Sequence, residues 1–239
     1  MQLVVDIGNT RIKAARFNER TLEEEVIIAD YSQLPALAKA WNCRQCIISS
    51  VGTSAEEVAK SLTAVCDVYI LDAKIALPII NSYASPETLG PDRIAAAVGG
   101  WAQFKNKPVL IFDAGTCLTT EFVTSDGKYL GGAISPGVKM RLKAMHEFTA
   151  RLPLAEFSEN LPELTGTTTE SCLQSGAING FLAEIEGVIL RYRQQYPDLQ
   201  VILCGGDAKI FEKRVKPAIF VLPKLVLTGL NEILLHNAQ

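Results

Sequence analysis

Short apolar runs alternate along the first half of the chain with segments of helical character. Residues 3–5 form an apolar run that predicts a strand, and residues 6–10 and 11–17 predict a turn and a second, antiparallel strand. The elements expected after this hairpin are a strand at 46–50, a helix at 55–63, a strand at 67–71 and an Ala-rich helix at 92–104. Strands that alternate with helices are typical of α/β proteins with a mostly parallel sheet.

The opening pattern returns near the middle of the chain. An apolar strand expected at residues 109–112 is followed by Asp113-Ala114-Gly115-Thr116 and by a hairpin partner at residues 117–123. The first strand is followed in the same way by Asp6-Ile7-Gly8-Asn9-Thr10. A strand, an Asp-x-Gly turn, a threonine and a second strand therefore occur twice in the same order.

The spacing of this repeat predicts how the chain is organised. Asp6 and Asp113 are 107 residues apart in a chain of 239, which indicates two duplicated lobes, residues 1–107 and 108–239, with a central cleft. The other elements expected in the second half are helices at 139–151 and 171–193, strands at 200–204 and 218–222, a helix from Gly229, and a loop at 152–168.

Composition and charge exclude several classes of protein. With 48% hydrophobic and 21% charged residues, the chain can bury a sizeable core without metal or disulfide staples. A net charge of -3 gives no basic field for nucleic acid or anionic lipid, and no apolar run approaches the ~20 residues of a membrane span. Because residues 1–6 lack the features of a signal peptide, we expect a cytoplasmic protein that binds neither nucleic acid nor membranes.

The six cysteines are scattered, and only Cys43 and Cys46 have the spacing of a zinc or redox pair. A zinc site would need a second such pair, which the chain lacks. Cys46 also opens an expected strand, whereas a thioredoxin-like pair would begin a helix. We therefore expect reduced, structural cysteines.

Both Asp-x-Gly turns carry residue types that suit phosphate binding. Gly8 lets the backbone approach an anion closely, Thr10 adds a hydroxyl donor and Lys13 adds a positive charge. Asp6, at the end of a strand, can hold hydrated magnesium. A lone Asp-x-Gly is most often an ordinary turn, but the repeated motif resembles the paired phosphate hairpins of the acetate and sugar kinase, heat-shock chaperone and actin superfamily. That resemblance implies an α/β fold of duplicated actin-like, ribonuclease H-like lobes.

A glycine pair, Gly205 and Gly206, lies between an expected strand and an expected helix. The pair could let a flat purine or ribose pack against backbone, and an ordinary strand-to-helix turn explains it equally well. The chain lacks the Gly-x-Gly-x-x-Gly and Gly-x-x-x-x-Gly-Lys spacings here, which sets aside dinucleotide folds and P-loops. Lys139 and Arg141 follow Gly137 into a helix; they could bind phosphate, but a solvated helix face is the favoured interpretation.

The tetrapeptide Gly90-Pro91-Asp92-Arg93 places a carboxylate and a guanidinium at the start of an expected helix. Arg93 can hold a substrate carboxylate through bidentate hydrogen bonds, and Asp92 can accept the proton of a substrate hydroxyl as its oxygen attacks phosphorus. Taken alone, the same residues are more typical of a capping aspartate beside a solvated arginine.

Together, the motifs at residues 6–10, 90–93 and 113–116 resemble, in order and spacing, those of the type III pantothenate kinases. Residues 131–137 and the segment from Thr169 to Gly176 resemble the same family, and the resemblance runs from Met1 to the last helix. It implies a kinase that phosphorylates the 4′-hydroxyl of pantothenate with ATP, the first committed step of coenzyme A synthesis. It also implies Mg²⁺, a monovalent cation (K⁺ or NH₄⁺) and a homodimer with its active site at the subunit interface.

The resemblance also assigns roles to individual residues. Asp92 matches the general base. The residues that match contacts to pantothenate are Tyr83, Gly90, Pro91, Asp92, Arg93 and Thr169. The residues that match the first nucleotide loop are Asp6, Ile7, Gly8, Asn9, Thr10, Arg11, Ile12 and Lys13, with Thr116 in the second loop and Asp113 as the ligand of the monovalent cation. Two departures are visible. Cys117 replaces a usual alanine, and Thr167-Thr168-Thr169 stands where the family commonly has Asn-Thr, so that a slip of one residue would select Thr168 instead of Thr169.

The implied mechanism is a direct in-line transfer, in which Asp92 takes the hydroxyl proton and Arg93 fixes the far end of the substrate. Two alternatives stay open at this point. The chain could be a nucleotide-binding regulatory protein that has lost the catalytic step, or a phosphatase of the same superfamily that releases phosphate to water.

Overall fold

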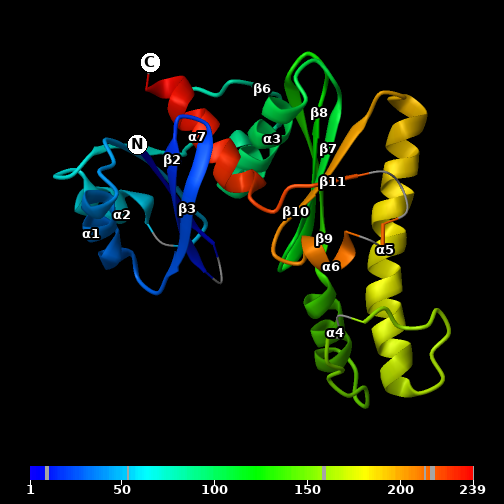
Figure 1. Cartoon of the computed structure of the whole chain (residues 1–239). Helices are drawn as coiled ribbons and strands as arrows, with labels where there is room; N and C mark the ends of the chain where they lie inside the picture. The colour runs from blue at the N-terminus through cyan, green and yellow to red at the C-terminus, as the bar shows by residue number, and fades with distance from the viewer. Residues whose placement is uncertain (9–10, 53, 158–159, 213, 216–218, 239) are drawn as a thin grey trace. The chain divides into compact units, whose positions relative to one another are not determined.

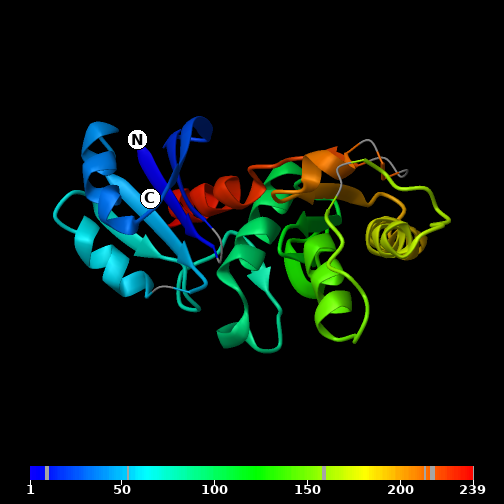
Figure 2. The same ribbon diagram turned by 90° about the horizontal axis from the view of Figure 1, so that it is seen from below.

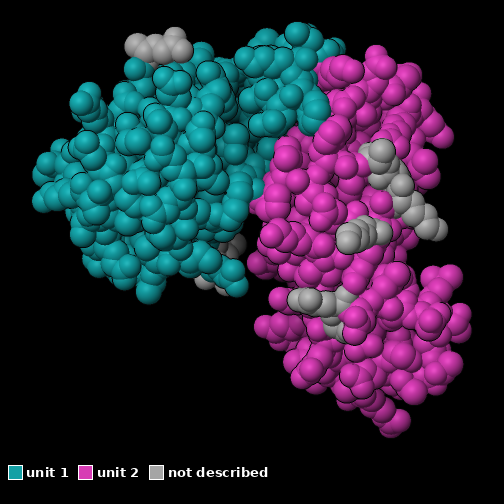
Figure 3. All heavy atoms as spheres, viewed as in Figure 1, with its two compact units in different colours: residues 1–106, 123–130, 224–239 teal, residues 107–122, 131–223 magenta. Residues whose placement is uncertain are grey.

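The computed structural model describes residues 1–8, 11–52, 54–157, 160–212, 214–215 and 219–238 (Figure 1). The chain divides into two compact units, which Figure 3 shows in different colours. Unit 1 comprises residues 1–106, 123–130 and 224–239, and unit 2 comprises residues 107–122 and 131–223. The last segment of the chain therefore belongs to the same unit as the first.

Unit 1 contains a five-stranded sheet in the order β3-β2-β1-β4-β5. Its strands are β1 (Gln2–Ile7), β2 (Ile12–Asn18), β3 (Thr21–Ile28), β4 (Gln45–Ser50) and β5 (Asp67–Ile70). β1 pairs with β2 in the antiparallel and with β4 in the parallel direction, so the first strand lies at the centre of the sheet. The expected hairpin at the start of the chain is confirmed.

Helices cover both faces of this sheet (Figure 2). Alternate residues of β1, namely Leu3, Val5 and Ile7, pack in one core with α1 (Leu34–Ala40) and α2 (Ala55–Leu62). The opposite face receives α3 (Pro91–Gln103) and α7 (Leu225–Asn237), which pack on each other and on the central strands. Because side chains alternate along a strand, the face that carries Asp6 is the one under α3 and α7. Short 3₁₀ turns at Tyr31–Gln33 and Pro86–Thr88 complete the unit.

The second sheet has six strands in the order β11-β10-β7-β8-β9-β6. Its strands are β6 (Ile80–Asn81), β7 (Val109–Ala114), β8 (Cys117–Val123), β9 (Lys128–Pro136), β10 (Gln200–Cys204) and β11 (Phe220–Val221). β6 pairs with the first residues of β9, and both of these segments belong to unit 1. Apart from Val123 at the end of β8, the rest of the sheet belongs to unit 2, which also contains α4 (Val138–Glu147), α5 (Thr169–Gln195) and the short α6 (Ala208–Phe211).

The core of unit 2 lies between this sheet and the long helix α5. Phe112 on β7 and Phe181 on α5 belong to one buried cluster, and Phe181 packs against Phe211 with ring centroids 4.8 Å apart. None of the helices in the described ranges is long and apolar enough to cross a membrane.

Most expected elements are confirmed, and the exceptions have physical reasons. β3 and α1 were not expected, because the outer strand β3 carries three glutamates in a row and α1 contains a proline at its start. α7 begins at Leu225 and not at Gly229, since its first apolar residues already pack into the core. α4 ends at Glu147 and not at residue 151.

The cysteines fit the structural interpretation. All six are reduced thiols and not disulfides, and Cys43, Cys46 and Cys204 are buried. Burial raises the pKa of the Cys43 thiol to about 11, so this group stays protonated and unreactive at neutral pH.

Candidate functional site

The first group of candidate residues surrounds Asp6 at the end of β1. The strand register places Asp6 opposite Lys13 on β2 and opposite Ser49 on β4, so all three side chains share one face of the sheet. Burial raises the pKa of the Asp6 carboxyl, and the charge of Asp92 raises it further, whereas Lys13 and Ser49 lower it. The fully buried Ser49 hydroxyl lies near the carboxylate but makes no hydrogen bond of ordinary geometry.

Asp92 lies in the first turn of α3. Gly90 is the N-cap of this helix, and Pro91, which has no N–H to leave unpaired, follows it. The Asp92 carboxylate accepts a hydrogen bond of 2.9 Å from the backbone N–H of Arg93. The first turn of α3 lies close enough to the end of β1 for the charge of Asp92 to raise the pKa of Asp6. The structure thus joins the motifs at residues 6–8 and 90–93, which are more than 80 positions apart in the chain.

Arg93 packs against an aromatic side chain. The residue is only 7% exposed, and its guanidinium lies over the ring of Tyr83, 5.6 Å from the centroid. Tyr83 in turn stacks on the fully buried Tyr129 at 6.1 Å, and its backbone N–H donates to Asn81 Oδ1 at 3.1 Å. The expected pair of Tyr83 and Arg93 is therefore in contact. Tyr129 was missed, because nothing in its local sequence marks it as the support of Tyr83.

The second group of candidate residues lies in unit 2, around Asp113 on β7. β10 runs parallel to β7 with Cys204 opposite Asp113, and Gly205 follows directly with a φ of +93°. A Cβ on Gly205 would lie 2.4 Å from both the Ala114 carbonyl oxygen and Asp113 Oδ1. Only glycine allows the two chain segments to come this close. The backbone N–H of Asp207 also joins them, because it donates to the Ala114 carbonyl at 2.9 Å.

The other side of the same turn is enclosed by Gly137. Its backbone N–H donates to the Thr116 carbonyl at 3.2 Å, and a Cβ at this position would lie 2.3 Å from the Gly115 carbonyl oxygen. Gly137 is also the N-cap of α4, which has no side-chain cap. The expected glycine pair and the segment at residues 131–137 are therefore both brought to the second Asp-x-Gly turn.

Charged side chains around the second turn come from α4 and α6. Burial raises the pKa of the half-buried Asp207 carboxyl, and the positive charge of Lys139 opposes that rise. Lys139 also lies 5.5 Å from the ring of Phe157. Arg141 pairs with Glu184 on α5 and donates to the Pro136 carbonyl at 2.8 Å, and it is only 20% exposed. The interpretation of a solvated helix face is therefore wrong for Arg141, which joins α4 to α5 and β9.

Thr169, the first residue of α5, lies at an open cavity of about 460 Å³. The residues that line this cavity are Met145, Leu152, Gly166, Thr167, Thr168, Thr169, Cys172 and Leu173. Thr168 is the N-cap of α5, and its hydroxyl accepts a hydrogen bond from the Ser171 N–H at 3.2 Å. The Thr168 hydroxyl is therefore used for capping, which distinguishes it from the hydroxyl of its neighbour Thr169.

The remaining expected residues are placed as follows. Ile7 ends β1 and is buried, Ile12 begins β2, and Arg11 between them is exposed, while the Gly8 N–H donates to the Arg11 carbonyl at 3.1 Å. Thr116 is exposed in the second turn. Asn9 and Thr10 lie outside the described residues.

The chemistry of the donors decides which ions fit. No group of three His, Cys, Asp or Glu side chains clusters in the part of the chain that the structure describes. Mg²⁺ is usually held by one or two carboxylates together with water and substrate phosphates, so the neighbouring carboxylates of Asp6 and Asp92 fit this ion. The Asp113 carboxylate and the Ala114 carbonyl, both beside Gly205, offer the oxygen ligands that hard cations take.

Comparison with known proteins points to one family. A family model described as type III pantothenate kinase matches residues 2–191. A type III pantothenate kinase from Bacteroides fragilis (strain YCH46) is 43% identical over 240 residues, which cover 99% of this chain and 98% of the relative.

Solved structures of other proteins share the fold. A protein from Campylobacter jejuni described as a Baf family transcriptional activator gives a TM-score of 0.65 at 20% identity, over 99% of this chain and 98% of its own. A glucokinase from an Antarctic psychrotroph gives 0.54 at 11% identity, over 98% of each chain. At such identities the likeness concerns the fold alone. It confirms the expected α/β architecture of duplicated actin-like lobes.

Proposed function

Because this chain belongs to the type III pantothenate kinase family, we propose that it transfers a phosphoryl group from ATP to the 4′-hydroxyl of pantothenate, the first step of coenzyme A biosynthesis, in the cytoplasm. The observation that carries the proposal is the charge arrangement at the end of β1. Lys13 lies opposite Asp6, and the carboxylate of Asp92 acts on Asp6 from the first turn of α3. Phosphoryl transfer needs a cation, a phosphate-binding charge and a base in one place.

Asp92 is the group that we propose as the general base. Its carboxylate is oriented by the Arg93 N–H at 2.9 Å, and it belongs to the rigid first turn of a 13-residue helix. A base held in this way can accept the proton of the substrate hydroxyl as that oxygen attacks the γ-phosphorus. The carboxylates of Asp6 and Asp92 repel each other, and a cation bound between them would relieve this repulsion. The pair therefore favours binding of a cation beside the base.

Arg93 is the group that we propose for the pantothenate carboxylate. A guanidinium can bind a carboxylate through two parallel hydrogen bonds, and the ring of Tyr83 limits the orientations available to it. A side chain that is already ordered loses less entropy when the substrate binds. Gly90 and Pro91 lie next to this pair and are the further substrate contacts that we propose in unit 1. Thr169, which lines the cavity of unit 2, is proposed as a pantothenate contact on the family match alone.

The nucleotide and its cations are assigned on the same grounds. We propose that residues 6–13 bind the phosphates of ATP, with Lys13 as the charged contact and magnesium at Asp6. Magnesium, when bound, neutralises part of the phosphate charge. Thr116 is the proposed nucleotide contact of the second turn, and Asp113 is the proposed ligand of K⁺ or NH₄⁺. The assignment of Asp113 is supported by the oxygen-lined turn that Gly205 and Gly137 enclose.

The proposal is tested by coupled ADP release, measured with and without pantothenate and with and without K⁺. Release that depends on both additions is the expected result. Release without pantothenate would identify a phosphatase, and no release in any mixture would identify a binding protein. Either of these results would overturn the proposed function.

The base is tested by Asp92→Asn. We expect kcat to fall by a factor of about 10² to 10⁴, with folding and ATP binding retained, because only proton acceptance is lost. The matched control is Asp67→Asn, which removes an exposed carboxylate at the start of β5 in the same unit and leaves kcat unchanged. Near-wild-type turnover of Asp92→Asn would remove Asp92 as the base.

We also propose that the protein is a homodimer. Large apolar side chains of unit 2 are exposed in the single chain, among them Phe148 (85%), Leu164 (81%) and Ile134 (62%). Exposed apolar side chains on this scale favour association with a partner surface. Light scattering coupled to size-exclusion chromatography should give twice the chain mass, and a single-chain mass at enzyme working concentration would contradict the proposal.

A further inference from the structure

Lys224 lies at the start of α7, where it is the N-cap residue of that helix. Its ammonium group forms an ion pair with Glu25 on β3. The two partners differ in exposure, since the side chain of Lys224 is 51% exposed and that of Glu25 only 15%. The positive charge therefore stays accessible to a ligand, while the carboxylate that holds it is largely covered.

The strand register places this ion pair beside the Asp6 group. Glu25 lies opposite Ala15, and Ala15 is two residues from Lys13, so Glu25 and Lys13 are diagonal neighbours on one face of the sheet. Lys13 is itself opposite Asp6 on the next strand. The start of α7 thus adds an ammonium group, 211 positions away in the chain, to the face that carries the first phosphate turn.

Residues of like charge are neighbours around Asp6 and Lys13. Burial lowers the pKa of Lys224, and the positive charge of Lys13 lowers it further, as expected for two neighbouring ammonium groups. The carboxylates of Asp6 and Asp92 are neighbours in the same way. A pair of cations beside a pair of carboxylates is complementary to a magnesium–polyphosphate complex, which carries a divalent cation beside anionic oxygens.

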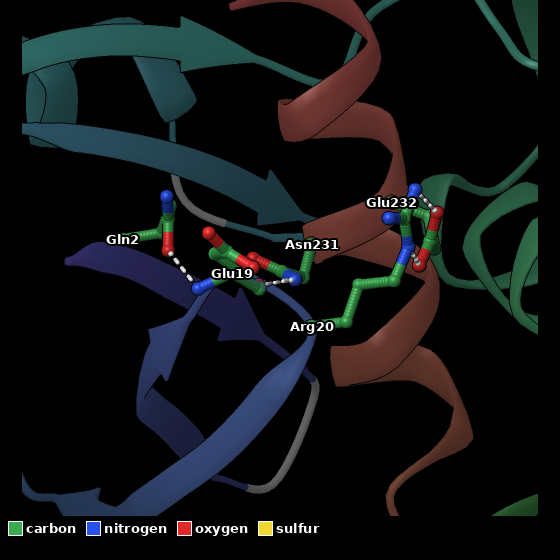
Figure 4. Close-up of polar contacts among 5 residues, drawn as sticks. All are labelled: Gln2, Glu19, Arg20, Asn231 and Glu232. Carbon is green, nitrogen blue, oxygen red and sulfur yellow. Dashed lines mark hydrogen bonds and ion pairs between the residues drawn. The ribbon is translucent and has the colours of Figure 1, made fainter.

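A purely structural role for Lys224 is weakened by the other contacts of α7. Arg20 Nε lies 2.7 Å from Glu232 Oε1, and Asn231 Nδ2 donates to the Glu19 carbonyl at 2.7 Å (Figure 4). These contacts join α7 to the turn between β2 and β3, and Asn231 is buried. The helix is therefore attached to this sheet without Lys224, whose ammonium group is half-exposed and partly screened by solvent.

We infer that Lys224 is a second phosphate-binding residue, which contacts the polyphosphate of ATP together with Lys13. This inference rests on the proposed function for the identity of the nucleotide. The inference goes beyond the proposed function, because it assigns a residue at the start of the last helix to the first phosphate site. Lys224 moves from Glu25 toward the bound phosphates, or contacts both, and no bond is formed or broken.

The experiment measures binding of ATP with Mg²⁺ by titration calorimetry, apart from turnover. For Lys224→Met we expect the Kd for ATP to rise about tenfold, with the Kd for adenosine unchanged, because only the phosphates lose a contact. Lys224→Arg should recover most of the affinity. The KM for ATP should rise in parallel in the ADP-release assay, while kcat and the KM for pantothenate stay close to the wild-type values.

Two controls separate phosphate binding from a structural effect. Glu25→Gln breaks the same ion pair but keeps the ammonium group, so ATP affinity should not fall. Lys60→Met removes an exposed lysine of α2 on the opposite face of the sheet and should change nothing. Equal losses in Glu25→Gln and Lys224→Met, or an unchanged Kd in Lys224→Met, would overturn the inference. A wild-type protein that binds ATP but does not phosphorylate pantothenate would overturn the proposed function and leave this inference standing.

Discussion

The two Asp-x-Gly turns have nearly the same sequence and very different surroundings. Asp6 is surrounded by charged and polar side chains that come from other elements: Lys13, Ser49 and Asp92. Asp113 is enclosed by backbone, because glycine loops from β10 and from the start of α4 press against its turn. Duplication of a motif between the proposed lobes, 1–107 and 108–239, therefore does not duplicate its environment.

This difference indicates that the two turns bind ligands through different groups, the first through charged side chains and the second through backbone. Side-chain charges can neutralise phosphates and hold magnesium, and they can be changed one at a time without moving the backbone. A turn packed between glycine backbones instead offers carbonyl and N–H groups at short range, and its shape depends on the absence of Cβ atoms. The first turn should be sensitive to loss of charge and the second to added volume.

The largest expected effect comes from Gly205→Ala. The new Cβ would lie 2.4 Å from the Ala114 carbonyl oxygen on a backbone with a φ of +93°. Steric overlap and left-handed strain together should lower the free energy of unfolding by about 3 kcal/mol. Urea denaturation of the purified variant measures this loss as a shift of the unfolding midpoint.

Two alanine substitutions serve as matched controls for that experiment. A Cβ on Gly206 meets nothing within 4 Å, and a Cβ on Gly8 meets the Arg11 carbonyl at an ordinary 3.5 Å. Both variants should stay within about 0.5 kcal/mol of the wild type. If Gly8→Ala cost as much stability as Gly205→Ala, the contrast between the two turns would be wrong.

The next effect compares one lysine near each turn, Lys13 on β2 and Lys139 on α4. Lys13→Met should raise the KM for ATP by about 10- to 100-fold, because Lys13 faces the Asp6 group and supplies charge to the phosphates. Lys139→Met should raise it less than about threefold, since Lys139 is exposed and balances Asp207. Initial rates with ATP varied at saturating pantothenate give both values. Equal increases would show that the second turn also depends on side-chain charge.

How much of this site could be predicted from the sequence depends on the distance between its parts. The Asp6 turn, the Asp113 turn and the start of α3 were predicted, because each is a local pattern of strand, glycine and proline. Lys224 was not predicted, since only the register of β2 with β3 and the packing of α7 bring it near Lys13. Contacts made by tertiary packing leave no mark on neighbouring residues.

The same limit explains the errors in the fold. β3 was missed because consecutive glutamates hide the alternation of a strand at the sheet edge, where only one face packs. Tyr129 was missed because its role depends on the pairing of β6 with β9. Arg141 was placed on a solvated face, but its partner Glu184 is 43 residues away on α5.

The smallest effect concerns Asp207, the half-buried carboxylate beside the second turn. Burial raises its pKa above the ordinary value, so the folded state disfavours the charged form. Asp207 therefore begins to lower stability as the pH rises past the ordinary pKa, and its full effect is reached above the raised pKa. Asp207→Asn keeps the backbone N–H bond to Ala114 and should raise the free energy of unfolding at pH 7 by under about 0.5 kcal/mol, because solvent screens a half-exposed group.

The gain should vanish as the pH falls below about 3.9, where the carboxyl is protonated in both states. In a Lys139→Met background the gain should be larger, since the opposing charge is gone. Urea unfolding at several pH values decides the matter: a gain that persists in acid would show that the asparagine acts through packing and not through the lost charge.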